Sequence, residues 1–212
     1  MIKIVLADDH AIMRGGLKEV LARVPEFELI GEATNGIELL EVLRQKTPDV
    51  LLTDLSMPGL SGYDLIERIK SSHPTLHVLV LTMHNDPQMA SRIIKLGAEG
   101  YLTKDRSPAE LIAAIHKVAD GGKCIDQSLA EKILFNTSPD EPHNQLSNRE
   151  LDVLRLLLKG DSVNHISEQL CISNKTVSTH KSTMLRKMGM SSTTELVRYA
   201  IQHELFNDAE GQ

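Results

Sequence analysis

The chain has 212 residues, of which 41% are hydrophobic and 25% are charged, the balance of a soluble globular protein of one or two domains. No run of about 18 apolar residues occurs, which excludes a membrane-spanning helix. The four consecutive apolar residues before Asp8 are too few for the core of a signal peptide. We therefore expect a cytoplasmic protein that does not act at a membrane.

The charge is unevenly distributed along the chain. The segment Ser147–His203 holds eight Lys or Arg and five Asp or Glu, which gives it a net charge of +3. Since the whole chain carries −6, the remaining residues together carry −9. Aromatic residues make up only 3% and Trp is absent, which weakens any function based on stacking with single-stranded nucleic acid. The pattern favours a small basic module joined to an acidic one.

Five short apolar runs alternate with helical patterns over the first 120 residues. The runs are Ile2–Ala7, Phe27–Ala33, Asp49–Thr53, Leu76–Leu81 and Gly100–Leu102. Apolar residues between them recur at helical spacing, as at Leu39, Leu40 and Leu43. Alternating strands and helices predict an α/β, flavodoxin-like, doubly wound domain over residues 1–121, with a five-stranded parallel sheet in the order 2-1-3-4-5.

A different pattern follows this domain. Residues 122–145 contain two prolines in a polar cluster, which predicts a linker, with one short helix at Ser128–Phe135. Residues 146–206 show no strand pattern and predict a small all-α domain of four helices. Its first helix begins at Ser147, whose capping box is completed by Glu150, and it ends at Gly160. The other three helices are expected at Ser162–Leu170, Asn174–Met188 and Thr193–Glu204.

Three carboxylates follow strands that should be neighbours. Asp8 and Asp9 come directly after the first run, and Asp54 comes directly after the third. The carboxyl ends of strands 1 and 3 open into one crevice, where unpaired carboxylates would repel one another. A hard cation such as Mg²⁺ relieves this repulsion. The alternative is a set of solvated loop carboxylates.

Two further residues end strands at the same crevice. Thr82 comes directly after the fourth run and Lys104 follows the fifth. A lysine can pair with the acids and later with a phosphoryl oxygen, to which a threonine hydroxyl can donate. Either residue alone would be an ordinary surface lysine or strand threonine.

Together these motifs resemble the receiver domain of two-component response regulators over roughly Met1–Gly121. The motifs are Asp8-Asp9, Asp54-Leu-Ser-Met-Pro-Gly59, Leu81-Thr82 and Gly100-Tyr101-Leu-Thr-Lys104. The resemblance implies that Asp54 accepts a phosphoryl group from a sensor histidine kinase or a phosphotransfer protein. It also implies that Asp8 or Asp9, Asp54 and the backbone carbonyl of Ser56 ligate Mg²⁺.

The resemblance assigns further roles around this site. Thr82 and Tyr101 would form the switch pair, Lys104 would bind the phosphoryl group, and Met83 and His84 would border it. The chain departs from many receivers in that Asp105 follows Lys104 where they carry proline.

The C-terminal segment has the pattern of a helix-turn-helix, formed by Ser162–Leu170, a short turn and Lys175–Lys181. Residues 174–188 hold four basic residues and no acid, which suits a helix that enters a major groove. A small helical bundle with a solvated basic face is the alternative.

The spacing of Leu146-Ser, Arg149-Glu150, Ile172-Ser173, Thr176-Val177 and Lys187-Met188 closely resembles the LuxR-type DNA-binding domain. The whole chain is then similar to the NarL/FixJ subfamily of transcription factors. This implies double-stranded promoter DNA and RNA polymerase as partners, and a homodimer when phosphorylated. The DNA contacts expected from the resemblance are Lys175, Thr176, Ser178, Thr179, Lys181, Ser182 and Lys187. Ser178 and Ser182 depart from the basic residues that are frequent in the family.

Two other classes of protein share parts of this pattern. A phosphatase with an aspartate nucleophile normally needs an acid two residues beyond the nucleophile, where Ser56 stands. A scaffold that never uses phosphate would not need the complete set of acids, threonine and lysine. We therefore expect a regulator and not an enzyme.

Overall fold

The computed structural model describes residues 1–58, 60, 62–83, 87–126, 129–131, 142–170, 172–203 and 205, with the backbone alone at residues 88, 144 and 148. The chain divides into two compact units, Met1–Ile133 and Leu134–Gln212. Within the described ranges, every helix is too short or too polar to cross a lipid bilayer.

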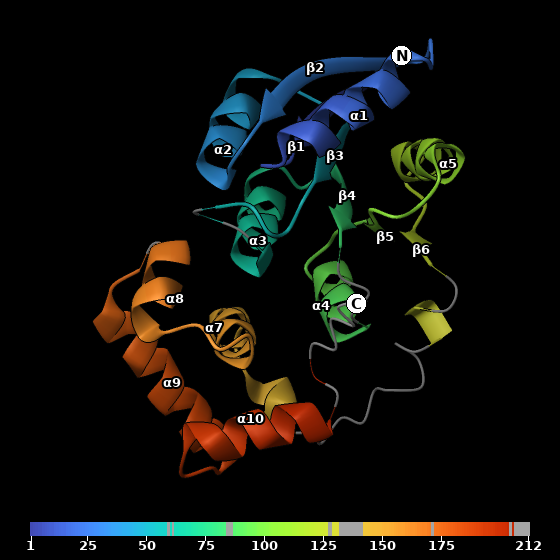
Figure 1. The fold of residues 1–212 in the computed structure, drawn as a ribbon. Coiled ribbons are helices and arrows are strands. Elements are labelled where there is room, and N and C mark those ends of the chain that lie inside the picture. Colours follow the sequence, from blue (N-terminus) through green and yellow to red (C-terminus); the bar gives the residue numbers. More distant parts are fainter. Residues whose placement is uncertain are drawn as a thin grey trace. The chain divides into compact units, whose positions relative to one another are not determined.

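The N-terminal unit is built on one parallel sheet (Figure 1). Its strands are β1 (Ile2–Ala7), β2 (Phe27–Ala33), β3 (Val50–Thr53), β4 (His77–Thr82), β5 (Gly100–Thr103) and β6 (Cys124–Ile125). They lie in the order β2-β1-β3-β4-β5-β6. The predicted order of the first five strands is confirmed.

The sixth strand was not predicted. Cys124 and Ile125 fall in the segment expected to be linker, yet they pair with Gly100 and Tyr101 of β5. Two residues are too few to show any hydrophobic periodicity. The open edge of β5 supplies the hydrogen-bonding groups, so the pairing depends on the finished sheet and not on a local signal.

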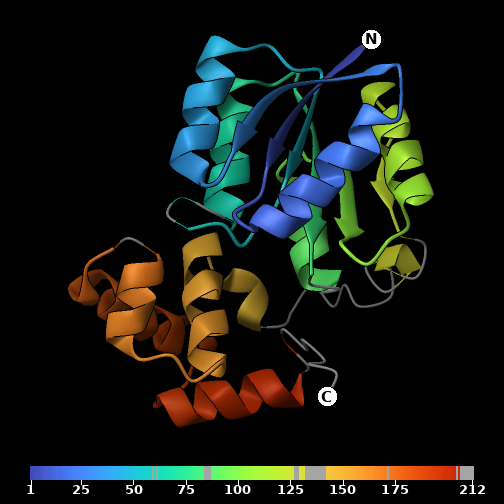
Figure 2. The ribbon, with the colours of Figure 1, turned by 45° about the horizontal axis from the view of Figure 1, so that its top comes forward.

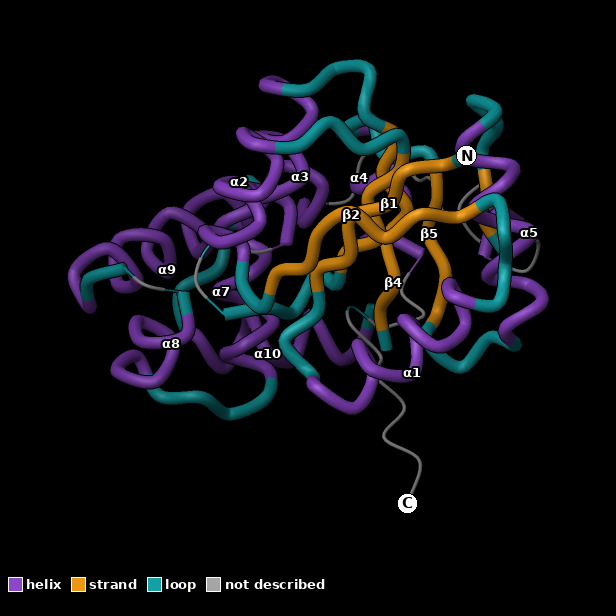
Figure 3. The backbone as a smooth tube through the Cα atoms, turned by 90° about the horizontal axis from the view of Figure 1, so that it is seen from above, coloured by secondary structure: helices purple, strands orange, loops and turns teal. Residues whose placement is uncertain are grey.

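Helices cover both faces of the sheet (Figures 2 and 3). They are α1 (Ala11–Ala22), α2 (Gly36–Gln45), α3 (Gly62–Ser72), α4 (Pro87–Lys95) and α5 (Pro108–Ala119). α1 and α5 share one face, where Leu21 and Ile115 pack in the same apolar cluster as Leu6, Leu52 and Leu79. Since both faces are covered, the central strands are buried along nearly their whole length, as their continuous apolar runs require.

The described part of the C-terminal unit is helical. It comprises the 3₁₀ turn η1 (Pro142–Gln145) and the helices α7 (Asn148–Leu158), α8 (Val163–Gln169), α9 (Asn174–Met188) and α10 (Thr193–Gln202). The predicted capping box is present, because Ser147 and Glu150 each accept the backbone N–H of the other. Gly160, at φ 86°, follows the end of α7 as expected. Of the helix expected at Ser128–Phe135, all but 129–131 lies outside the described residues.

Apolar residues at helical spacing form the core of this unit. Val177, Met184 and Met188 are the buried residues of α9, and they leave its other faces exposed or half-buried. Each of the four helices begins at a serine whose hydroxyl accepts a backbone N–H of the first turn. These caps fix where each helix starts, so the face that α9 presents follows from local sequence.

Candidate functional site

Strand register brings the predicted acids together at the carboxyl edge of the sheet. Ala7 of β1 is paired with Thr53 of β3, so Asp8 and Asp54 leave adjacent strands at the same level. The N–H of Asp54 also donates to the carbonyl of Ala7, at 2.9 Å. Both carboxylates are buried, with 1% of Asp8 and 3% of Asp54 exposed.

Lys104 lies between these two carboxylates. Its Nζ is 2.8 Å from Oδ2 of Asp8 and 2.8 Å from Oδ2 of Asp54. The register of β4 with β5 places it there, because the N–H of Lys104 donates to the carbonyl of Thr82. Burial by itself lowers the pKa of Lys104, but the hydrogen bonds and negative charges of the two aspartates outweigh this, so its pKa lies above the ordinary value. Lys104 is therefore a protonated cation at neutral pH.

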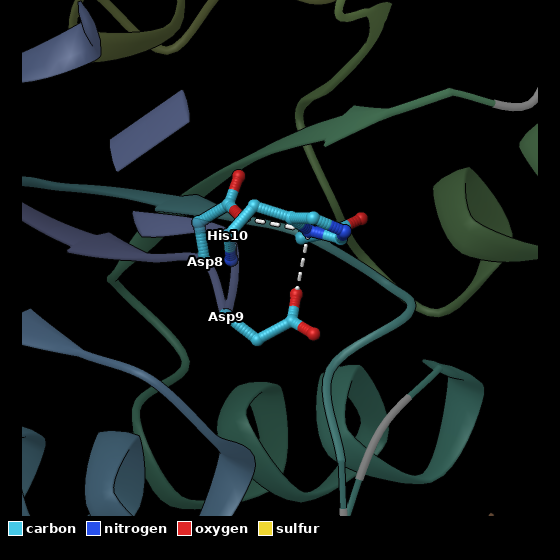
Figure 4. Close-up of side chains that lie close together, drawn as sticks. Asp8, Asp9 and His10 are labelled. Atoms are coloured by element: carbon cyan, nitrogen blue, oxygen red, sulfur yellow. Dashed lines mark hydrogen bonds and ion pairs between the residues drawn. The ribbon is translucent and has the colours of Figure 1, made fainter. Parts of the chain in front are cut away.

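The next residues along the chain complete an acidic cluster (Figure 4). Oδ1 of Asp9 is buried and has no hydrogen-bond partner, although its side chain is 30% exposed overall. The His10 ring turns toward both neighbours, with Nδ1 at 2.9 Å from Oδ1 of Asp9 and 3.4 Å from Oδ1 of Asp8. Ligand atoms of Asp8, Asp9, His10 and Asp54 lie within 4.8 Å of one another, close enough for one metal ion.

His10 is not among the residues that the sequence motifs predict for this site. Its position directly after two candidate ligands was the available signal, but one histidine beside acids is common on protein surfaces. Only the direction of the ring shows that it belongs to the cluster.

The structure places the remaining predicted residues as follows. Thr82, the last residue of β4, and Tyr101, the second residue of β5, are fully buried. Met83, directly after β4, is 71% exposed. Ser56, on the loop that follows Asp54, is also exposed. His84 lies outside the described residues. The Lys104–Asp105 peptide bond is trans, as are the other bonds in the described ranges.

In the C-terminal unit, one face of α9 gathers most of the predicted DNA contacts. Lys175, Ser178, Thr179 and Ser182 are exposed. They line a shallow groove together with Thr183 and Arg186. Spacings of three and four residues place them on one face of the helix. Arg186 and Thr183 are not among the DNA contacts that the resemblance implies, although the same spacing could have found them. Thr176 and Lys181 lie at the flanks, both half-buried.

Lys187 is not brought to this face. Its Nζ donates to Oε2 of Glu150 at 2.7 Å, across 37 residues of sequence. Burial by itself raises the pKa of Glu150, but the hydrogen bonds from Lys187 and Ser147 outweigh it and hold the pKa below its ordinary value. Lys187 is thus committed to a carboxylate inside its own unit.

Side-chain hydrogen bonds hold the turn before α9. Arg149 donates to the carbonyl of Leu170 at 2.6 Å, which ties α7 to the end of α8. Asn174 donates to the side chain of Asn164 at 2.7 Å, which ties the start of α9 to α8. These bonds make the orientation of α9 relative to α8 a fixed feature of the unit.

A doubly wound unit with this acidic crevice, followed by a helix-turn-helix unit, defines a class of phosphorylation-dependent regulators. Comparison with protein families agrees. Residues 4–116 match the model of the response regulator receiver domain, and residues 144–200 match that of the bacterial regulatory proteins of the luxR family. The chain belongs to the response regulators, in the subfamily that joins a receiver to a LuxR-type module.

Relatives match along nearly the whole chain. The response regulator UvrY of Escherichia coli K12 is 34% identical over 98% of this chain and 97% of its own. The oxygen regulatory protein NreC of Staphylococcus carnosus is 37% identical over 97% of this chain and 99% of its own. These relatives are regulators and not enzymes, which excludes the aspartate phosphatase considered above.

Solved structures give the same result. RcsB of Salmonella enterica serovar Typhimurium, bound to the promoter rprA in the presence of the phosphomimetic BeF₃⁻, matches with a TM-score of 0.69 at 33% identity. The match covers 94% of this chain and 98% of that one.

Proposed function

We propose that Asp54 accepts a phosphoryl group from a sensor histidine kinase or a phosphotransfer protein, and that this controls dimerisation and promoter binding. The observation that carries the proposal is the geometry of Lys104, which holds Asp54 and Asp8 together in a buried crevice. A carboxylate oxygen of Asp54 attacks phosphorus, the bond from phosphorus to the donor breaks, and an acyl phosphate forms on Asp54. Lys104 then faces a phosphoryl group that adds roughly −1.5 to −2 units of charge.

The residues of the crevice fit Mg²⁺, the cation of receiver domains. Asp8, Asp9, Asp54 and the backbone carbonyl of Ser56 would hold it, and hard oxygen donors of this kind suit that ion. The proximity of the carboxylates supports this, because ligand atoms of Asp8, Asp9 and Asp54 lie within 4.8 Å of one another. When bound, Mg²⁺ would neutralise part of the charge of the carboxylates and the phosphoryl oxygens.

Thr82 and Tyr101 would change position in response to the charge of the phosphoryl group. Thr82 ends β4 beside Lys104, so its hydroxyl can donate to a phosphoryl oxygen after a small inward movement. Tyr101, now fully buried, lies on the neighbouring strand and would adjust to the space that Thr82 leaves. A ligand-dependent shift between two packings of this kind alters the surface around β5.

The exposed face of α9 would insert into the major groove of promoter DNA. Lys175 and Lys181 would contact phosphates, whereas Ser178, Thr179 and Ser182 would face base edges. Thr176 and Lys187 were expected to join them, but the ion pair with Glu150 argues that Lys187 acts within the protein. As a transcription factor, the dimer would work with RNA polymerase in the cytoplasm. The promoter-bound RcsB relative supports this use of the unit.

Phosphorylation with a small donor tests the first step. Acetyl phosphate and Mg²⁺ should label the wild type, and Asp54→Asn should lose the acyl phosphate because the amide cannot accept it. Asp120→Asn is the matched control, since Asp120 is exposed at the end of α5 and should not affect labelling. Stable labelling of the Asp54→Asn protein at the wild-type level would refute the assignment.

Light scattering and footprinting test the consequence. Beryllofluoride should shift the wild type from monomer or weak dimer to dimer at micromolar concentration and should strengthen protection of promoter DNA. Paired half-sites require two DNA-binding units, so the two effects should appear together. The same mass and the same footprint with and without beryllofluoride would count against phosphate control.

A further inference from the structure

Arg14 of α1 donates to the backbone of the loop that carries the first two acids, although the proposed reaction does not use it. Its Nη1 is 2.8 Å from the carbonyl oxygen of Asp8, and its side chain is 19% exposed. The helix places it there, because Arg14 lies one turn beyond His10, whose carbonyl accepts its backbone N–H at 2.9 Å. The side chain therefore reaches back from the first turn of α1 to the residue that follows β1.

The carbonyl of Asp8 matters because it belongs to the same peptide unit as the N–H of Asp9. A peptide unit is planar, so a donor that fixes its carbonyl also fixes the plane from which the next residue continues. Other polar groups of Asp8 are already held, since its N–H donates to the carbonyl of Ala33 at 3.1 Å and its Oδ2 faces Lys104. The bond from Arg14 therefore acts on the direction in which the chain leaves for Asp9.

Asp9 needs such support more than Asp8 and Asp54 do. Its side chain is 30% exposed, whereas those of Asp8 and Asp54 are almost fully buried and are joined by Lys104. The carboxylate of Asp9 lies beside the His10 ring, which is itself 65% exposed (Figure 4). Neither packing nor a buried ion pair therefore fixes the direction of Asp9, which makes its backbone the means of control.

Glu32 of β2 holds the guanidinium of Arg14 in this direction. Its Oε2 is 3.6 Å from Nε of Arg14, while its Oε1 is 2.6 Å from Nζ of Lys18. The backbone of Glu32 is fixed in turn, since it is paired with Leu6 of β1. A guanidinium is planar and rigid, so an acid beside Nε also limits where Nη1 can point. Because the bond to the loop goes to a carbonyl, it takes up no carboxylate oxygen that a cation would need.

We propose that Arg14 is a positioning residue for phosphoryl transfer, which fixes the peptide between Asp8 and Asp9 so that the carboxylate of Asp9 lies in the crevice before a cation arrives. The proposal rests on the proposed function, since it takes Asp9 as a ligand of Mg²⁺. A ligand that is fixed in advance loses little conformational freedom when the ion binds, so the affinity is higher. Loss of a partner that orients a metal ligand typically costs about 10- to 100-fold in metal affinity.

Calorimetric titration of the full chain with Mg²⁺, in the absence of a phosphodonor, tests the position of the ligand. Arg14→Met, which keeps the apolar stem, should lose about tenfold in Mg²⁺ affinity. Arg14→Lys should recover part of this loss, because its ammonium can still donate to the carbonyl of Asp8. Glu32→Gln should lose less, about threefold, because a half-exposed ion pair contributes little and only the guanidinium is loosened. Arg44→Met, which removes an exposed arginine of α2, is the matched control and should bind Mg²⁺ as the wild type does.

Labelling by acetyl phosphate over a range of Mg²⁺ concentrations gives a readout that a purely structural role would not move. In Arg14→Met the Mg²⁺ concentration at half-maximal rate should rise about tenfold, whereas the rate at saturating Mg²⁺ should stay within about twofold of the wild type. The reason is that a bound cation restores the direction of Asp9. Hydrogen exchange of residues 8–12 should accordingly be faster in the variant without Mg²⁺ and equal to the wild type with it.

Wild-type Mg²⁺ affinity in Arg14→Met would overturn the proposal. A lower rate at saturating Mg²⁺ with an unchanged half-maximal concentration would do the same, since Arg14 would then act on the reaction and not on the cation ligand. If Arg14→Met does not fold, Glu32→Gln decides, because unchanged Mg²⁺ affinity in that variant contradicts the proposal and a loss supports it.

These results are distinguishable from failure of the proposed function. If Asp54 is labelled in the wild type but Arg14→Met binds Mg²⁺ as the wild type does, the proposed function stands and the role of Arg14 is refuted. If Asp54→Asn keeps the wild-type label while Arg14→Met loses Mg²⁺ affinity, the phosphoacceptor is wrong and the positioning of Asp9 stands. If the wild type neither binds Mg²⁺ nor becomes labelled, both are refuted.

Discussion

Lys104 in the receiver and Lys187 in the LuxR-type unit both donate to buried carboxylates, yet only one of them is available for a functional partner. Lys104 bridges two acids, Asp8 and Asp54, and its side chain is 3% exposed. Lys187 contacts one acid, Glu150, and its side chain is 31% exposed. The family resemblance had assigned Lys104 to the phosphoryl group and Lys187 to DNA.

The carboxylate partners explain the difference. Glu150 already accepts the N–H of Ser147 in a capping box. Lys187 neutralises the same carboxylate, so the pair has no charge left for a further partner. Asp8 and Asp54 lie at the crevice where a phosphoryl group and a cation would arrive, so Lys104 can exchange one anion for another. A buried ion pair is thus structural or functional according to what else its acid can bind.

The largest expected effect is that of Lys104→Met on the receiver. Removal of one partner of a buried pair leaves uncompensated charge, so the free energy of unfolding should fall by about 3–5 kcal/mol. Urea denaturation of the full chain, followed by hydrogen exchange in β1 and β3, would measure it. Lys95→Met, at an exposed position of α4, is the control and should change little. A loss below about 1 kcal/mol would mean that the two aspartates are not held by this lysine.

The second prediction separates Lys187 from Lys175. Lys187→Met should lower the free energy of unfolding of the LuxR-type unit by about 2 kcal/mol, because a charged hydrogen bond to a buried carboxylate is lost. It should leave the salt dependence of DNA binding unchanged. Lys175→Met should leave stability unchanged and reduce the slope of log affinity against log salt by about one unit.

Denaturant titrations and DNA binding over a salt series, both on the full chain, give the two measurements. If Lys187→Met reduces the salt slope as much as Lys175→Met does, then Lys187 reaches DNA as the family resemblance had implied.

The third prediction concerns acid. The folded pKa of Glu150 lies below its ordinary value of 4.5, so its pairing stabilises the folded state above that pH and the stabilisation is lost as pH falls through the folded pKa. Glu150→Gln should therefore lower stability at pH 7 and flatten the decline of stability below about pH 4.5. Circular dichroism against pH would show it. Glu110→Gln, in the exposed capping box of α5, should alter the decline less. Equal effects of the two variants would contradict the role of burial at Glu150.

Much of the molecule was predictable because its signals are local. Buried strands require continuous apolar runs, so five of the six strands were found close to their observed bounds. Serine caps and glycine stops marked the helices of the C-terminal unit, and α9 begins and ends where its sequence predicts. The acids of the crevice were predictable because strand order alone determines which strand ends are neighbours.

Only the tertiary structure decided the pairings between distant or ambiguous groups. Lys187 and Glu150 meet across 37 residues because α7 and α9 pack together, and no periodicity records that contact. β6 exists because the edge of β5 offers hydrogen bonds to a two-residue segment. The ring of His10 turns toward Asp8 and Asp9 although most of it stays exposed, a choice of rotamer that the residues beside it in sequence leave open. Local sequence determines which backbone each residue adopts, whereas the direction and partner of a polar side chain depend on the packed chain around it.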